Sequence, residues 1–225
     1  MIAAQWKPIP ELVAKLRAHK KVLVAGCATC VAECAAGGER EAETLAPLLT
    51  LALAEEGLSV DVITVTFERQ CEFEFYNEMA ELLETEKVDA VVSLACGIGV
   101  QAFIEWFPGV RVYPGVNTSS LVIREAPGVW TARCEACGDC ILDETFGVCP
   151  VARCSKGILN GPCGGTSNEG KCEVNPDTEC AWKLIVDRAI EAGRVEDLMD
   201  VRMPKNYSNS RHGGPKRIVR EDLQA

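Results

Sequence analysis

Residues 21–27 read KVLVAGC, a short apolar run rich in valine that stops at a glycine and a cysteine. The same form recurs in VDAVVSLAC at 88–96, and related apolar runs occupy SVDVITVT at 59–66 and VRVYPGV at 110–116. Short, nearly continuous apolar runs bounded by turn residues are typical of buried strands in a parallel sheet. The first half of the chain is therefore predicted to contain a set of such strands.

Helical patterns lie between these runs. EREAETLAPLLTLALAEEG at 39–57 has apolar residues at helical spacing and a glycine at its end, and NEMAELLETEK at 77–87 has a similar pattern. Strands that alternate with helices imply a parallel sheet with right-handed crossovers. We therefore expect the α/β class, with residues 1–130 forming a small Rossmann-like domain.

The composition changes after residue 130. Eight cysteines fall in 134–180, about 17% of that segment, against the roughly 8–10% that already signals a cysteine-built fold. Residues 131–202 are predicted to form an irregular, metal-organised domain closed by a helix, AWKLIVDRAIEAGRVEDLMD at 181–200, with Trp182, Ile185 and Ile190 packing it back. Residues 203–225 form a polar, basic tail, either disordered or an extended arm on a partner.

Bulk composition limits the function. A hydrophobic content of 48% allows an ordinary core, and the net charge of −10 argues against nucleic-acid binding. No apolar run reaches about 18 residues and the N-terminus is amphipathic, so we expect a soluble, cytoplasmic chain without a membrane span. Thirteen cysteines are an odd number, and only two histidines occur. Any metal is thus bound almost wholly by thiolate, which leaves zinc or iron–sulfur.

Five cysteines fall at the predicted strand ends. Cys27, Cys30 and Cys34 follow the first strand in CATCVAEC, Cys71 follows the second, and Cys96 closes the third. Because ligands of open parallel sheets bind beyond the carboxyl ends of the strands, we expect a metal site there, with Cys34 as the surplus thiol. The alternative is that these cysteines are small buried apolar residues. A dinucleotide site is disfavoured because GCATCVA lacks the G-x-G-x-x-G spacing.

The second set begins with CEACGDC. The two-residue gaps between Cys134, Cys137 and Cys140 allow three thiolates of one loop to meet one cluster, as in bacterial ferredoxins. Cys149 precedes a proline, as the ferredoxin cysteine that binds the other cluster does, so it need not complete the site that Cys134 begins. The further candidate ligands are Cys154, Cys163, Cys172 and Cys180.

The identity of the metal stays open at this point. Structural zinc sites usually pair one C-x2-C with another, and no second pair follows Cys140, which favours iron–sulfur over zinc. Eight thiolates suit two four-thiolate sites. With the strand-end site, we expect two or three [4Fe-4S] clusters, with zinc at one site as the alternative. NGPCGG at 160–165 is either a turn whose backbone N–H groups face cluster sulfur or a surface turn carrying one ligand.

Several motifs carry a family resemblance. WTARCEACGDC (130–140), CPVARCSKGILNGPCGG (149–165) and KCEVNPDTECAW (171–182) closely resemble the cysteine-rich MetV-type family, the C-terminal-domain family of methylenetetrahydrofolate reductase. VAGCATCVAEC (24–34), GGERE (37–41) and SLACGIGVQ (93–101) fit the same family. The resemblance covers most of residues 20–185 and none of the tail after about 200.

This resemblance implies a partner subunit rather than a whole enzyme. Members accompany a flavin-bearing TIM-barrel subunit that reduces methylenetetrahydrofolate to methyltetrahydrofolate, a step of the methyl branch of one-carbon fixation (the Wood–Ljungdahl pathway) in acetogens. The family is described both as zinc-binding and as iron–sulfur. We therefore expect a non-catalytic electron-transfer subunit that relays electrons to its partner's flavin, with a further electron-donating subunit as an additional candidate partner. The alternative is a structural zinc scaffold of the same reductase.

Overall fold

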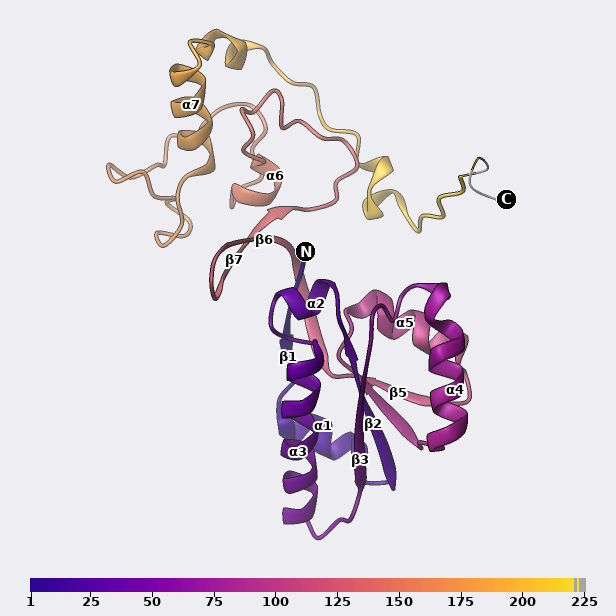
Figure 1. The fold of residues 1–225 in the computed structure, drawn as a ribbon. Coiled ribbons are helices and arrows are strands. Elements are labelled where there is room, and N and C mark those ends of the chain that lie inside the picture. The colour runs from indigo at the N-terminus through magenta and orange to yellow at the C-terminus, as the bar shows by residue number, and fades with distance from the viewer. Residues whose placement is uncertain (221, 223–225) are drawn as a thin grey trace. The chain divides into compact units, whose positions relative to one another are not determined.

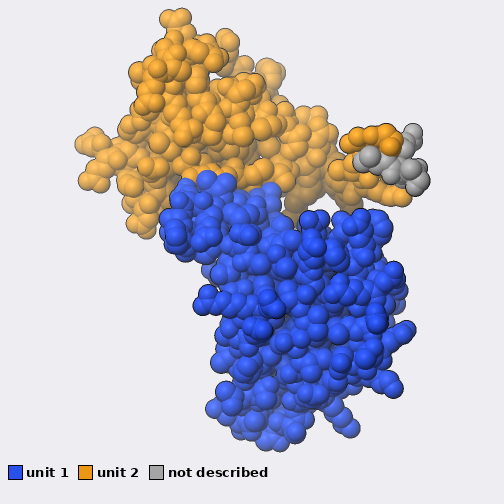
Figure 2. All heavy atoms as spheres, in the orientation of Figure 1, with its two compact units in different colours: residues 1–131 blue, residues 132–225 orange. Residues whose placement is uncertain are grey.

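The computed structural model describes residues 1–220 and 222, so the last part of the predicted tail lies outside the described residues. The chain divides into two compact units, residues 1–131 and 132–225 (Figure 2).

The first unit is built on a four-stranded parallel sheet in the order β3-β2-β4-β5. Its strands are β2 (Lys21–Cys27), β3 (Asp61–Phe67), β4 (Ala90–Ser93) and β5 (Arg111–Pro114). The helices that connect them are α3 (Glu39–Glu55), α4 (Tyr76–Glu86) and α5 (Gly97–Trp106), and the short α2 (Cys30–Glu33) follows β2. The predicted α/β fold class is confirmed.

Helices cover both faces of this sheet (Figure 1). Val22 and Val24 of β2 pack in a buried cluster with residues of α3 and of α1 (Ile9–Leu16). Leu23 and Ala25, which alternate with them, pack on the opposite face in a cluster with residues of α4 and α5. Because successive side chains of a strand point to opposite faces, the continuous apolar run VLVA fills two separate cores at once.

A second sheet of the first unit contains strands that the sequence patterns did not reveal. β1 (Ile2–Trp6) pairs antiparallel with β6 (Val116–Ala126), and β7 (Val129–Cys134) completes the order β1-β6-β7. Trp6 fastens β1 to the loop after α2 by donating its indole N–H to the Ala36 carbonyl at 2.6 Å. The N-terminus of this domain is thereby held close to the loop that carries three of the cysteines.

The second unit has little regular structure. Its helices are the short α6 (Pro150–Arg153) and α7 (Ala181–Glu191), and short 3-10 turns occupy Val195–Met199, Tyr207–Asn209 and Arg211–Gly213. Val148, Ala181, Trp182 and Ile185 form its small buried cluster. In the part of the chain that the structure describes, no helix is long and apolar enough to cross a membrane.

The prediction for the C-terminal helix is partly wrong. Trp182 and Ile185 are buried as expected, but Ile190 is 60% exposed and Ala189 is buried in its place. Positions 182, 185 and 189 follow the three- and four-residue spacing of one helix face, whereas position 190 lies well around the helix from Ile185. The helix also ends at Glu191, before a glycine with positive φ (Gly193), rather than at residue 200.

Candidate metal centres

The first candidate centre lies at the carboxyl ends of the parallel strands. Cys27 is the last residue of β2, Cys71 lies in the turn after β3, and Cys96 is the N-cap residue of α5, just beyond β4. β2 lies between β3 and β4 in the sheet. The chain passes from β2 to β3 on one side and then crosses to β4 on the other side, so the strand order reverses next to β2. Such a reversal of strand order is where open α/β sheets bind their ligands.

Cys71 lies near other candidate thiols. Burial by surrounding atoms raises the pKa of the Cys71 thiol, and the neighbouring thiols of Cys27, Cys96 and Cys30 raise it further. A second thiolate raises the pKa of a thiol appreciably only when the two groups lie within about a Debye length of each other, roughly 10 Å. The fold therefore brings Cys27, Cys30, Cys71 and Cys96 into one neighbourhood. That they bind metal stays a prediction.

Cys34 has a different environment. Its Sγ faces the Val31 carbonyl at 3.3 Å and the Ala4 carbonyl at 3.9 Å, and the residue is buried within the α1/α3-side core. Burial raises the pKa of this thiol, with no other cysteine among the causes. Cys27 and Cys96 are buried in the same cluster, so burial does not distinguish Cys34 from them. Cys34 is favoured as the surplus thiol because no neighbouring thiol affects its pKa.

Gln70, directly before Cys71, is a site residue that sequence reasoning missed. It is fully buried, and its Nε2 donates to the carbonyls of Ala25 and Gly26, both at 2.9 Å. Its Oε1 accepts a 2.6 Å hydrogen bond from the hydroxyl of Ser93. One side chain thus ties the turn after β3 to the ends of β2 and β4, the three places that supply Cys71, Cys27 and Cys96. A lone glutamine carries no motif, so the sequence offered no signal for this role.

The second candidate centre belongs to the cysteine-rich unit. One small hollow is lined by four cysteines together with polar side chains of the same loops. These cysteines are Cys154, Cys163, Cys172 and Cys180. Its volume of about 20 Å³ holds about one water molecule, so the flanking loops must move apart before a four-iron cluster fits.

Polar groups surround the sulfurs of this hollow. The Thr166 hydroxyl donates to Cys180 Sγ at 3.0 Å, and the Cys163 thiol lies 3.5 Å from Glu173, which is paired with Lys156. The Ser155 hydroxyl, with help from backbone N–H groups, lowers the pKa of the Cys172 thiol. Hydrogen bonds donated by a hydroxyl or a backbone N–H stabilise thiolate, the form that binds metal. The Glu173 carboxylate, in contrast, can only accept a hydrogen bond from the Cys163 thiol.

The third candidate centre is the loop CEACGDC. Cys134 is the last residue of β7, and two residues with positive φ, Ala136 and Gly138, curl the backbone around it. The backbone N–H of Ala136 donates to Cys134 Sγ at 3.3 Å, and Cys137 Sγ lies 3.6 Å from the Asp139 carbonyl. Cys140 is exposed. Turns that direct backbone N–H groups at sulfur are suited to a bound thiolate centre.

Cys149 is half-buried before Pro150, the first residue of α6. Its assignment to one centre or another stays a prediction.

The donor chemistry of all three places is uniform. Each contributes thiols, without a histidine ligand, and this set suits iron–sulfur clusters or structural zinc. Within residues 1–220 and 222, no three His, Cys, Asp or Glu side chains stand close enough together to hold a metal ion. Metal binding at any of the three places stays a prediction.

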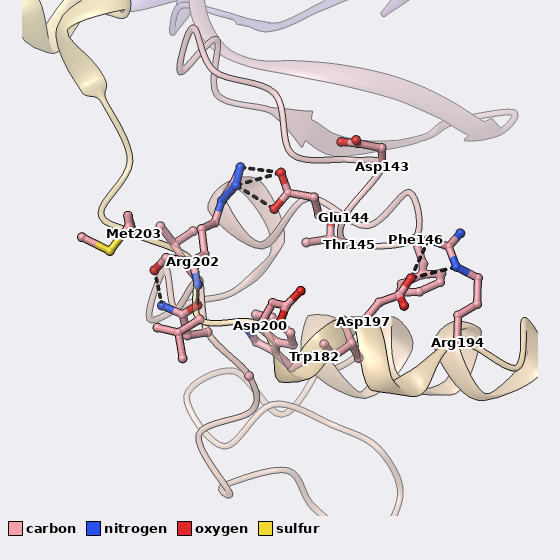
Figure 3. A pocket seen from close by; sticks show the side chains of 15 residues that line it. Asp143, Glu144, Thr145, Phe146, Trp182, Arg194, Asp197, Asp200, Arg202 and Met203 are labelled. Carbon is pink, nitrogen blue, oxygen red and sulfur yellow. Dashed lines mark hydrogen bonds and ion pairs between the residues drawn. The ribbon is translucent and has the colours of Figure 1, made fainter.

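Another hollow of the second unit has no cysteine in its lining. A cavity of about 590 Å³ is lined by residues 143–146, 159–161, Trp182 and the segment 194–203 (Figure 3). Within it the Arg202 guanidinium binds both carboxylate oxygens of Glu144, at 2.7 to 2.9 Å, and Arg194 pairs with Asp197. These ion pairs fix the course of the chain after α7.

Comparisons with known proteins bear on the second half of the chain. Residues 113–208 match the family model described as "Methylene-tetrahydrofolate reductase C terminal". The match covers the CEACGDC loop, the four-cysteine hollow and α7. The searches of curated proteins and of solved structures returned no match.

Proposed function

Because residues 113–208 belong to the methylenetetrahydrofolate reductase C-terminal family, we propose that this chain is an iron–sulfur electron-transfer subunit of such a reductase. Its partner is a flavin-bearing subunit that reduces methylenetetrahydrofolate to methyltetrahydrofolate in the cytoplasm. A further electron-donating subunit would complete the complex. The family match supports the association with the reductase, and the electron-relay role rests on the thiols.

The observation that carries the proposal is the grouping of the cysteines. Four thiols lie in one neighbourhood at the strand ends, four line one hollow, and three share one loop. Iron–sulfur clusters bound there would supply one-electron transfer, which a flavin pairs for hydride chemistry. A subunit whose only role is structural needs no thiol group on the α/β unit, which already has two apolar cores of its own.

The residues of this chain would bind and tune such centres. At the strand ends, the candidate ligands are Cys27, Cys30, Cys71 and Cys96, held by the hydrogen bonds of Gln70. At the hollow, the hydroxyl of Thr166 would stabilise negative charge on the Cys180 sulfur, which raises the reduction potential of a site.

Metal analysis tests this function. The full chain, purified without oxygen, is expected to be brown and to contain iron and acid-labile sulfide in equal amounts, enough for at least two four-iron clusters. Zinc as the sole metal, at about one ion per four thiolates, would overturn the proposal and establish a structural scaffold.

The relay is tested by reconstitution with the flavin-bearing partner. A low-potential one-electron donor should reduce the flavin of the partner much faster when this chain is present. Equal rates with and without the chain would refute the relay even if iron is present.

A further inference from the structure

Lys205 is a buried cation in the segment that the sequence predicts as a polar tail. Its side chain is 0% exposed, and its Nζ has no hydrogen-bond partner among the described residues. The nearest opposite charge is Asp139, whose Oδ2 lies 3.5 Å from Nζ. Asp139 stands between Cys137 and Cys140 in the CEACGDC loop. The ammonium group is therefore buried against the loop that supplies three candidate ligands.

Contacts on both sides hold the chain at this place. Before Lys205, the Arg202 guanidinium is bound to Glu144 (Figure 3), and the Arg202 backbone exchanges two hydrogen bonds with the Asn160 amide at 2.8 and 2.9 Å. After it, the backbone of Asn209 lies so close to Gly138 that a Cβ there would approach Asn209 to 2.7 Å. Lys205 is thus fixed on the loop by contacts other than its own ion pair.

The energetics of this arrangement require more negative charge than Asp139 supplies. A lysine ammonium has three N–H donors, and burying it without hydrogen bonds costs several kcal/mol unless a nearby anion compensates. Asp139 is 41% exposed and its 3.5 Å separation is long for a charge-assisted hydrogen bond, so its compensation is weak. Thiolates bound to a metal carry net negative charge, whether the metal is zinc or a four-iron cluster.

We propose that Lys205 is the counter-ion of the metal centre that Cys134, Cys137 and Cys140 bind: a positioning residue that offsets the charge of its thiolates without being a ligand. The inference rests on the proposed function only in that the loop binds metal. It adds that the segment 203–210 is part of this centre. A positive charge beside a cluster favours the reduced, more negative state, so Lys205 raises its reduction potential.

The test compares three variants of the full chain, purified without oxygen. Lys205→Met keeps the length of the side chain but removes its charge, and Lys205→Arg keeps the charge but adds bulk. Lys183→Met is the matched control, because Lys183 also pairs with an aspartate, Asp187, but on the exposed face of α7. The readouts are metal per chain, the rate of metal loss to a chelator, and the potential of each paramagnetic centre in an EPR redox titration.

The charge model predicts opposite behaviour for the two Lys205 variants. Lys205→Met should lose metal at least tenfold faster than the wild-type chain, and one centre should shift to lower potential, while Lys205→Arg and Lys183→Met resemble the wild type. A tenfold change in the ratio of reduced to oxidised centre corresponds to 59 mV for one electron. If Lys205 serves only to fill space, Lys205→Met is harmless and Lys205→Arg is the damaging change, which overturns the inference.

The remaining outcomes separate this inference from the proposed function. Equal metal loss and potentials in all variants of an iron-containing chain would refute the role of Lys205 and leave the relay intact. A chain that contains zinc alone would refute the relay, and the chelator rates would still decide the role of Lys205. If both Lys205 variants lose metal equally, charge is not the deciding property and the inference fails.

Discussion

The Gln70→Leu substitution tests whether one buried side chain holds the strand-end thiols together. Leucine is similar in volume but removes three hydrogen bonds, two to the carbonyls of Ala25 and Gly26 and one from Ser93. At a net 0.5–1.5 kcal/mol each, their loss costs about 1.5 to 4.5 kcal/mol of unfolding free energy. Because the three bonds join the ends of β2 and β4 to the turn that carries Cys71, the strand-end site should loosen as well.

The assay is urea unfolding of the full chain followed by far-UV circular dichroism, with iron measured on the same anaerobic samples. Gln101→Leu is the matched control, since its amide bonds only the Gly97 carbonyl on an exposed helix face and should change stability by less than about 0.5 kcal/mol. We expect Gln70→Leu alone to lower the unfolding midpoint and to lose the iron of one site. The reasoning is refuted if the two glutamine variants unfold at the same midpoint and keep the same iron.

Three further predictions concern single residues. Cys96→Ser should remove the iron of the first unit and leave the second unit folded, whereas Cys137→Ser should unfold much of the second unit. Iron content and limited proteolysis distinguish these two outcomes. Unchanged iron in Cys96→Ser would contradict a strand-end centre. Ile185→Ala should destabilise the second unit by about 2 to 5 kcal/mol because the Ile185 side chain is fully buried. Ile190→Ala, on the exposed face of the same helix, should change stability very little. Thermal unfolding of both variants checks this difference. In the metal-free chain, burial and the neighbouring thiols raise the pKa of Cys71, so its alkylation should be slow at neutral pH and should accelerate only at a higher pH than for an ordinary cysteine. Mass spectrometry measures the alkylation rate, and a normal profile would mean that Cys71 is neither buried nor close to the other strand-end thiols.

The parallel sheet could be predicted because each of its strands is locally apolar. KVLVAGC matches β2 residue for residue, and the predicted run 59–66 overlaps β3 (Asp61–Phe67) closely. The antiparallel sheet could not be predicted in the same way. β6 reads VNTSSLVIREA, in which four consecutive polar residues precede three apolar ones, so it has neither a continuous apolar run nor an alternating pattern. Its partner β1 lies more than a hundred residues away, and Ile2 pairs with Leu121. Nothing in either local pattern specifies that pairing.

The candidate sites also contain residues that the local sequence predicts and residues that it does not. The placement of Cys27 and Cys96 together follows from sheet topology, because both lie at strand ends that the sequence already indicates. The gathering of Cys154, Cys163, Cys172 and Cys180 at one hollow depends on turns with positive φ, including those at glycines 157, 161, 164 and 170. Gln70 and Lys205 matter because their side chains are buried, and a sequence pattern does not predict burial of an isolated polar residue. Such residues become visible only when their donors and acceptors are located.

The two units differ in how much they depend on a bound metal, and this difference bears on the relay. The first unit has a core on each face of its sheet, so its thiols are attached to a frame that folds by apolar burial alone. The second unit has only four residues in its buried cluster. Its polar segment after α7 is attached to the cysteine-rich loops through the ion pairs of Arg202 with Glu144 and of Lys205 with Asp139. A metal bound there would contribute folding free energy directly, because the site does not preexist in the unfolded chain. A centre on the rigid sheet would keep its hydrogen bonds, and hence its reduction potential, through each electron transfer. A centre in the second unit is instead sensitive to the packing of the chain around it, so residues such as Lys205 become part of its electrostatics.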